Sequence, residues 1–153
     1  MARRESHYTA EFEKLRAELV ERLDRIELRF ESVDRALVEM VRQVERSDRR
    51  EIRNRLAVLC EHLLKWQFVP PARGGGWYSS VRAARRQITD LIEENPALAP
   101  YPATWLAWAY ARGREKAEDE TGLVGLPEAC PWTIERVLDR EFWPIEAPAD
   151  EGR

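Results

Sequence analysis

The residue types that could carry chemistry are few, and His62 is the first candidate. It stands in the segment CEHLLKW, and the chain has only one other histidine, His7. A histidine can bind a metal or act as a general base, and Glu39 is the carboxylate that could join it from a facing helix. A zinc site needs three or four ligands, so a structural histidine in a helix interface is the favoured interpretation. No metal or cofactor is expected.

The two cysteines, Cys60 and Cys130, form no CxxC pattern. Cys60 is two residues from His62, and residues two apart on a helix point to different faces. The histidine is therefore not placed to activate the thiol, as a catalytic cysteine requires. The sequence shows no export signal, and we expect two reduced, inert thiols in a cytoplasmic protein.

Basic residues concentrate in the middle of the chain. Residues 62–89 carry five basic and no acidic side chains, whereas residues 115–153 carry eleven acidic and four basic ones. Arginines beside aromatic rings can bind phosphates and stack bases. The favoured alternative is internal ion pairing with the acidic C-terminal third. The candidate binding surface, here called the arginine-rich zone, comprises Arg46, Arg49, Arg50, Arg53, Lys65, Trp66, Arg73, Trp77, Arg82, Arg85 and Arg86.

The first element that must position these residues is a long apolar stripe at helical spacing. From Tyr8 to Val44 apolar side chains recur in steps of three and four, with one extra residue between Leu19 and Leu23. We expect either one helix or two helices that meet near Ser32, a fair N-cap, and the break is favoured. Such a stripe must be covered by another helix, from this chain or from a second copy, which favours a homodimer.

The following helices are delimited by caps and prolines. Ser47 is expected to start a helix that ends near Phe68, because the prolines at 70 and 71 cannot continue it. A helix opening near Trp77 should precede one over roughly 103–120, which Gly122 would stop.

Thr133 is expected to cap a short last helix. Since no segment alternates with period 2, the sequence predicts an all-α, single-domain helical bundle of about five or six helices with a long N-terminal helix or helix pair. This domain spans residues 1–145, and residues 146–153 form a loose acidic tail.

Composition excludes several classes of protein. The formal net charge is −3, from 28 acidic and 25 basic residues, which argues against a dedicated nucleic-acid binder. The longest apolar run, residues 105–111, has seven residues, whereas a membrane-spanning helix needs about 20. The sequence predicts a soluble domain without a membrane partner.

Several segments resemble a known bacterial family. They are SDRREIRNRLAVLCEHLLKWQF, WYSSVRAARRQI, EENPALAPY, ETGL and LPEACPWTIERVLDREFWP. In this order they resemble the domain-of-unknown-function family numbered 29 over roughly two thirds of the chain. The resemblance implies a small all-helical domain without an assigned activity. The first third departs from the family pattern, which has a DFYxW segment and a Glu-Glu pair. Here HYTAEFEKL and RALVEMV stand instead, with only Glu39 in place of the pair.

No catalytic pattern emerges, so the favoured function is a non-catalytic cytoplasmic interaction or regulatory module that forms a homodimer and binds a protein partner. One alternative is a nucleic-acid-associated protein that uses the arginine-rich zone, which is not favoured. A metal- or acid/base-dependent enzyme around His62 and Glu39 is favoured least.

Overall fold

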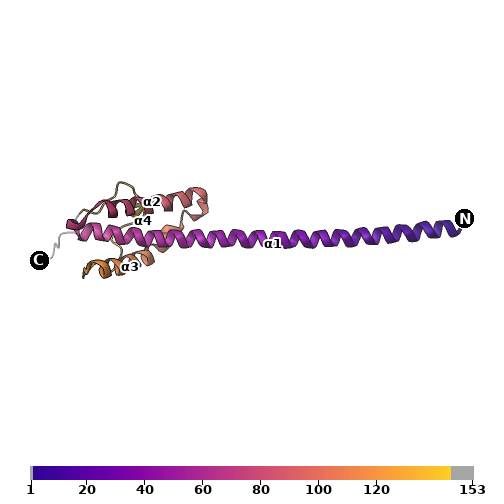
Figure 1. Cartoon of the computed structure of the whole chain (residues 1–153), viewed down its shortest axis with the longest axis horizontal. Helices are drawn as coiled ribbons and strands as arrows, with labels where there is room; N and C mark the ends of the chain where they lie inside the picture. The colour runs from indigo at the N-terminus through magenta and orange to yellow at the C-terminus, as the bar shows by residue number, and fades with distance from the viewer. Residues whose placement is uncertain (1, 146–153) are drawn as a thin grey trace. The chain divides into compact units, whose positions relative to one another are not determined.

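The computed structural model describes residues 2–145, with side chains from His7 onward, and every regular element in this range is helical. This confirms the all-α class. The elements, shown in Figure 1, are α1 (Ala2–Phe68), the 3-10 turn η1 (Pro70–Ala72), α2 (Gly75–Glu94), the 3-10 turn η2 (Pro96–Leu98), α3 (Tyr101–Thr121) and α4 (Ile134–Leu138).

The helix count is lower than the expected five or six. Residues 2–145 form four α-helices, because Ser32 and Ser47 lie inside α1 and neither starts a new helix. The predicted break and the predicted second start were therefore wrong. No proline or glycine occurs between residues 2 and 68, and serine within a helix costs only a few tenths of a kcal/mol relative to alanine, roughly 0.5. A capping residue does not end a helix that can continue through it.

The other expected helix ends are confirmed. Helix α1 ends at Phe68, two residues before the prolines. Gly122 follows α3 with a left-handed φ of 69°, and its N–H donates to the carbonyl of Glu118 at 2.8 Å. The hydroxyl of Thr133 accepts a hydrogen bond from the N–H of Arg136 and caps α4.

The chain divides into two compact units, residues 1–45 and 46–153. Within the described part of the first unit, the eleven stripe side chains from Tyr8 to Val44 are all exposed, by 48% to 70%. The acidic tail expected at 146–153 lies outside the described residues.

The second unit holds a buried core to which every helix contributes. In Figure 1, α2 and α3 lie on opposite sides of the C-terminal part of α1. The part of α1 in this unit buries apolar side chains that recur at helical spacing. The core includes Ile52, Leu56, Leu59 and Leu63 of α1, Val81 and Ile88 of α2, Ala109 and Tyr110 of α3, Val137 of α4, and Leu126 and Trp132 of the segment between α3 and α4.

At Gly113 the backbone of α3 lies directly against that of α1. A Cβ at this position would lie 2.6 Å from the backbone nitrogen of Glu61 and 2.7 Å from the carbonyl oxygen of Ala57. The two helix backbones therefore pack against each other with no room for a side chain.

No helix in the described part of the chain is long and apolar enough to cross a bilayer.

Candidate functional site

The arginines at the start of the arginine-rich zone contact aromatic rings of α3. The guanidinium carbon of Arg53 lies 5.0 Å from the ring centroid of Trp105 and 4.6 Å from that of Trp108. Arg49 lies 5.6 Å from the centroid of Tyr101. Such cation–π contacts contribute roughly 0.5–2 kcal/mol each, depending on burial. These two arginines thus join α1 to α3. Arg46, Arg49 and Arg50 are exposed.

Lys65 belongs to a buried ionic cluster between α1 and α3. Its ammonium donates to Glu61 at 2.5 Å and to Glu120, and Lys116 contacts the other oxygen of Glu61 at 3.2 Å. Lys65 and Glu61 are almost fully buried. Burial lowers the pKa of Lys65, but the hydrogen bonds to Glu120 and Glu61 outweigh that effect and leave the pKa raised.

The hydrogen bond from Lys65 in turn lowers the pKa of Glu120. The cluster realises part of the expected ion pairing, because Glu120 comes from the acidic C-terminal third. Every charge in it is paired, so it joins two helices and has no free group for chemistry.

Arg85 connects α2 to residues 137–145, here called the C-terminal segment. Its Nε donates to the carbonyl of Val137 at 2.9 Å and its Nη2 to the carbonyl of Phe142 at 2.8 Å, with a longer contact to the carbonyl of Arg140 at 3.4 Å. The side chain is 2% exposed, and burial lowers its pKa to about 10. Its donors are committed to backbone carbonyls, so Arg85 is a structural residue.

A second part of the zone forms an aromatic cluster with the C-terminal segment. The rings of Tyr78 and Trp143 stack at 4.8 Å with an interplanar angle of 11°, and Trp66 lies 4.7 Å from Trp143. Arg73 donates to the carbonyl of Trp66 at 2.6 Å and packs over its ring. Trp77 is half-buried beside Lys65, whose nitrogen lies 5.9 Å from its centroid.

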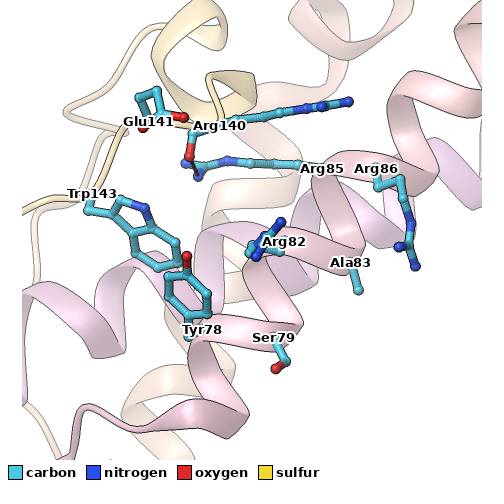
Figure 2. A pocket seen from close by; sticks show the side chains of 9 residues that line it. All are labelled: Tyr78, Ser79, Arg82, Ala83, Arg85, Arg86, Arg140, Glu141 and Trp143. Carbon is cyan, nitrogen blue, oxygen red and sulfur yellow. Dashed lines mark hydrogen bonds between the residues drawn. The ribbon is translucent and has the colours of Figure 1, made fainter.

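A cavity of about 750 Å³ lies between α2 and the segment after α4. Figure 2 shows its lining. Three exposed arginines border it, Arg82 and Arg86 from α2 and Arg140 from the C-terminal segment. The cavity is also lined by Tyr78, Ser79, Ala83, Arg85, Glu141 and Trp143. The structure thus separates the zone into side chains that build the fold and a small group that borders a cavity.

His62 is placed as a structural histidine would be. Its Nδ1 lies 2.8 Å from the carbonyl oxygen of Val58, one turn earlier on α1, and therefore donates to it. No group of three or more potential metal ligands occurs among the described residues. Glu39 belongs to the first unit and His62 to the second, so the pairing of the two stays a prediction.

Both thiols are free and sit in apolar surroundings. Cys60 is fully buried, and burial raises its pKa. Burial also raises the pKa of Cys130, whose Sγ donates to the carbonyl of Trp132 at 3.3 Å. Raised thiol pKa values are the opposite of what a nucleophilic cysteine needs.

Sequence reasoning missed the contribution of residues after α4 to this cavity. Arg140, Glu141 and Trp143 stand in the segment LDREFWP, more than forty residues after the end of α2. The buried Glu61–Lys65 pair was also missed, although its spacing of four on a helix is a visible signal. No local pattern could show that the segment after α4 packs against α2.

Comparison with known proteins places the chain in a family but assigns no activity. No curated protein and no solved structure matches it. A family described as "Domain of unknown function DUF29" matches residues 7–143. With a match over most of its length, the chain belongs to the DUF29 family.

Proposed function

We propose that this protein is a helical interaction module that assembles with a second copy of itself through the stripe from Tyr8 to Val44. The observation that carries the proposal is the exposure of all eleven stripe side chains, by 48% to 70%. A helix with such a stripe gains most of its stability from packing that face against a partner.

The size of the stripe supports a stable interface. Residues 8–44 of an α-helix extend over about 54 Å at ~1.5 Å per residue, and a helix is roughly 10 Å wide. Two such faces bury on the order of 1,000 Å² together, which is about the lower limit for a specific protein–protein interface. The stripe also exceeds the three to four heptads that are typical of a coiled coil.

Charged residues beside the stripe favour a parallel pairing in register. Leu23, Phe30 and Leu37 then take the a positions of a heptad. Before the extra residue that follows Leu19, Phe12 and Leu19 take the a positions. Residues before a (g) face residues after d (e) of the second copy.

In this register every charged g residue that has a charged e partner meets the opposite sign. The pairs are Glu11 with Arg16, Arg22 with Glu27, and Arg29 with Asp34 of the second copy. An antiparallel pairing of residues 22–34 with themselves would place arginine opposite arginine and acid opposite acid. Charge complementarity thus supports a second copy of this chain as the partner.

The oligomeric state of the full chain tests the proposal. Sedimentation equilibrium should give at least twice the mass of one chain. Leucine at a with isoleucine or valine at d also suits more than two strands, so three or four copies would keep the proposal and change the count. A monomer at every concentration would overturn it.

A pair of leucines provides matched variants. Leu23 lies on the stripe and Leu28 on the opposite face, and they are 63% and 62% exposed. Leu23→Glu should dissociate the assembly because it repeats a negative charge in the core of every copy, and Leu28→Glu should leave the mass unchanged. Equal effects of the two variants would contradict the assignment of the interface.

Cysteine cross-linking tests the register. Position 15 is a d position and would face itself in a parallel pair, whereas position 17 faces away. Under mild oxidation Leu15→Cys should give a covalent dimer, and Ala17→Cys should not. Failure of Leu15→Cys to cross-link in an oligomeric protein would exclude the parallel register.

A further inference from the structure

We infer that the cavity bordered by Arg82, Arg86 and Arg140 binds a small oligoanion, a ligand with two or more phosphate or carboxylate groups. The first support is uncompensated charge. Within residues 7–145 no ion pair joins any of these three arginines to an acidic side chain, and Glu141 is the one acid in the lining. Arg82 and Arg86 are also one helical turn apart, a like-charge spacing that destabilises a helix.

Because of Arg85, the arginines at this cavity are held in fixed positions relative to one another, unlike arginines scattered over a surface. It lies between the exposed arginines in sequence, but its guanidinium is held by the carbonyls of Val137 and Phe142. This buried anchor fixes the segment that carries Arg140 against α2. The position of the third arginine is thereby built into the fold.

The aromatic rings at the cavity argue for recognition of charge and against base stacking. Tyr78 already stacks on Trp143 and lies 5.6 Å from the guanidinium of Arg82. Trp143 also contacts Trp66 and lies 5.5 Å from Arg85. Both rings have neighbours of this chain. The donors that the lining side chains carry are guanidinium groups, the hydroxyls of Tyr78 and Ser79 and the indole N–H of Trp143.

The size and layout of the cavity indicate the ligand class. A volume of about 750 Å³ is within the range of small-molecule sites, about 300–1,000 Å³. Figure 2 shows the guanidinium groups of Arg82, Arg86 and Arg140 at three separate places around the cavity. Separate groups suit several anionic groups on one ligand, since each arginine can hold a phosphate or carboxylate with two parallel hydrogen bonds.

Isothermal titration calorimetry on the full chain tests the inference, with pyrophosphate and citrate as probes and inorganic phosphate for comparison. Pyrophosphate or citrate should bind at low salt and more tightly than inorganic phosphate. If pyrophosphate binds and citrate does not, the site requires phosphate groups. If citrate binds equally well, the site accepts oligoanions with either phosphate or carboxylate groups. Absence of binding by either probe would overturn the inference.

The variant R86Q/R140Q should weaken binding at least tenfold. The control variant R50Q replaces an arginine that is also exposed and lies outside the cavity, and it should bind like the unmodified protein. All three side chains are exposed, so the fold should persist, and circular dichroism checks this. Equal losses in both variants would overturn the site. A second result would also overturn the site. In that result, a short single-stranded RNA would bind more tightly than either probe, and R50Q would weaken its binding as much as R86Q/R140Q does.

Discussion

Arg85 and Arg86 are neighbours in sequence and differ in almost everything that decides a role. Arg85 is buried and donates to backbone carbonyls of the C-terminal segment, whereas Arg86 is exposed at the rim of the cavity. Arg53 is a third case, because its guanidinium makes cation–π contacts with two tryptophan rings of α3. At the scale of residues, the arginines of the arginine-rich zone make different contacts. The sequence alone does not show which of them are buried in the fold and which are exposed.

Substitution of Arg85 should be costly. Arg85→Met would leave the carbonyls of Val137 and Phe142 without donors, and each buried unsatisfied carbonyl costs about 1–3 kcal/mol. We expect the free energy of unfolding in urea to fall by about 3 kcal/mol. Arg86→Met is the control and should change it by less than about 0.5 kcal/mol, as exposed positions do. Equal stability of the two variants would contradict the anchoring role.

Gly113 provides a second test at this scale. Gly113→Ala would place a methyl group 2.6 Å from the backbone of Glu61, so α3 must move away from α1. We expect a loss of about 1–3 kcal/mol in the free energy of unfolding. Gly76→Ala is the matched control, since a Cβ there meets no atom within 4 Å and alanine suits a helix better. A harmless Gly113→Ala would show that the helices pack less closely.

At the scale of elements, α1 and α3 are joined by three kinds of contact. The cation–π contacts of Arg49 and Arg53 lie toward the start of the paired region. The close approach at Gly113 follows, and the ionic cluster of Lys65 and Glu120 comes last. The ionic cluster adds a dependence on pH that the other two kinds of contact lack.

Glu120 should make the stability fall in acid. Its pKa is lowered in the folded state, so its contribution is present above the ordinary glutamate pKa of about 4.3 and is lost as pH falls through the folded value. Unfolding free energies below that pH should decline more steeply for the unmodified protein than for Glu120→Gln. Glu115→Gln removes an exposed pair with Arg112 and should follow the unmodified protein.

The same cluster acts in the opposite sense in alkali. The pKa of Lys65 is raised, so its contribution is present below the ordinary lysine value and is lost as pH rises through the folded value. A pH profile of Glu120→Gln that is identical to that of the unmodified protein would show that the lysine draws its stabilisation from Glu61 alone.

At the scale of the whole molecule, the two units differ in how many of their apolar side chains are buried within the unit. The second unit has its own buried core, whereas the described side chains of the stripe in the first unit are exposed. All six tryptophans lie in the second unit. Tryptophan fluorescence therefore reports on that unit, and circular dichroism reports on both.

Dilution should separate the two signals. If the stripe is covered by a second copy, the helical signal in circular dichroism should decrease as the protein is diluted, because an unpaired surface helix is marginal in water. Tryptophan fluorescence should stay constant over the same range. A helical signal that is independent of concentration, with a monomeric mass, would contradict self-assembly.

The sequence by itself determined the all-α class, the stripe and several helix ends. These follow from local rules, because a proline lacks an N–H, a glycine accepts a left-handed φ, and apolar side chains repeat with the helical period. The same rules misplaced the starts at Ser32 and Ser47, since a cap is only a preference and nothing there prevents the helix from continuing.

Only the tertiary structure decided which arginines are committed to the fold and which border a cavity. Arg85 finds its acceptors 52 to 57 residues along the chain, and Arg140 reaches the cavity through that contact. Composition placed basic and aromatic residues in one region, but burial and long-range hydrogen bonds are properties of the packed chain. A guanidinium that donates to buried carbonyls and one that faces solvent are identical in sequence and differ only in what the fold brings to them.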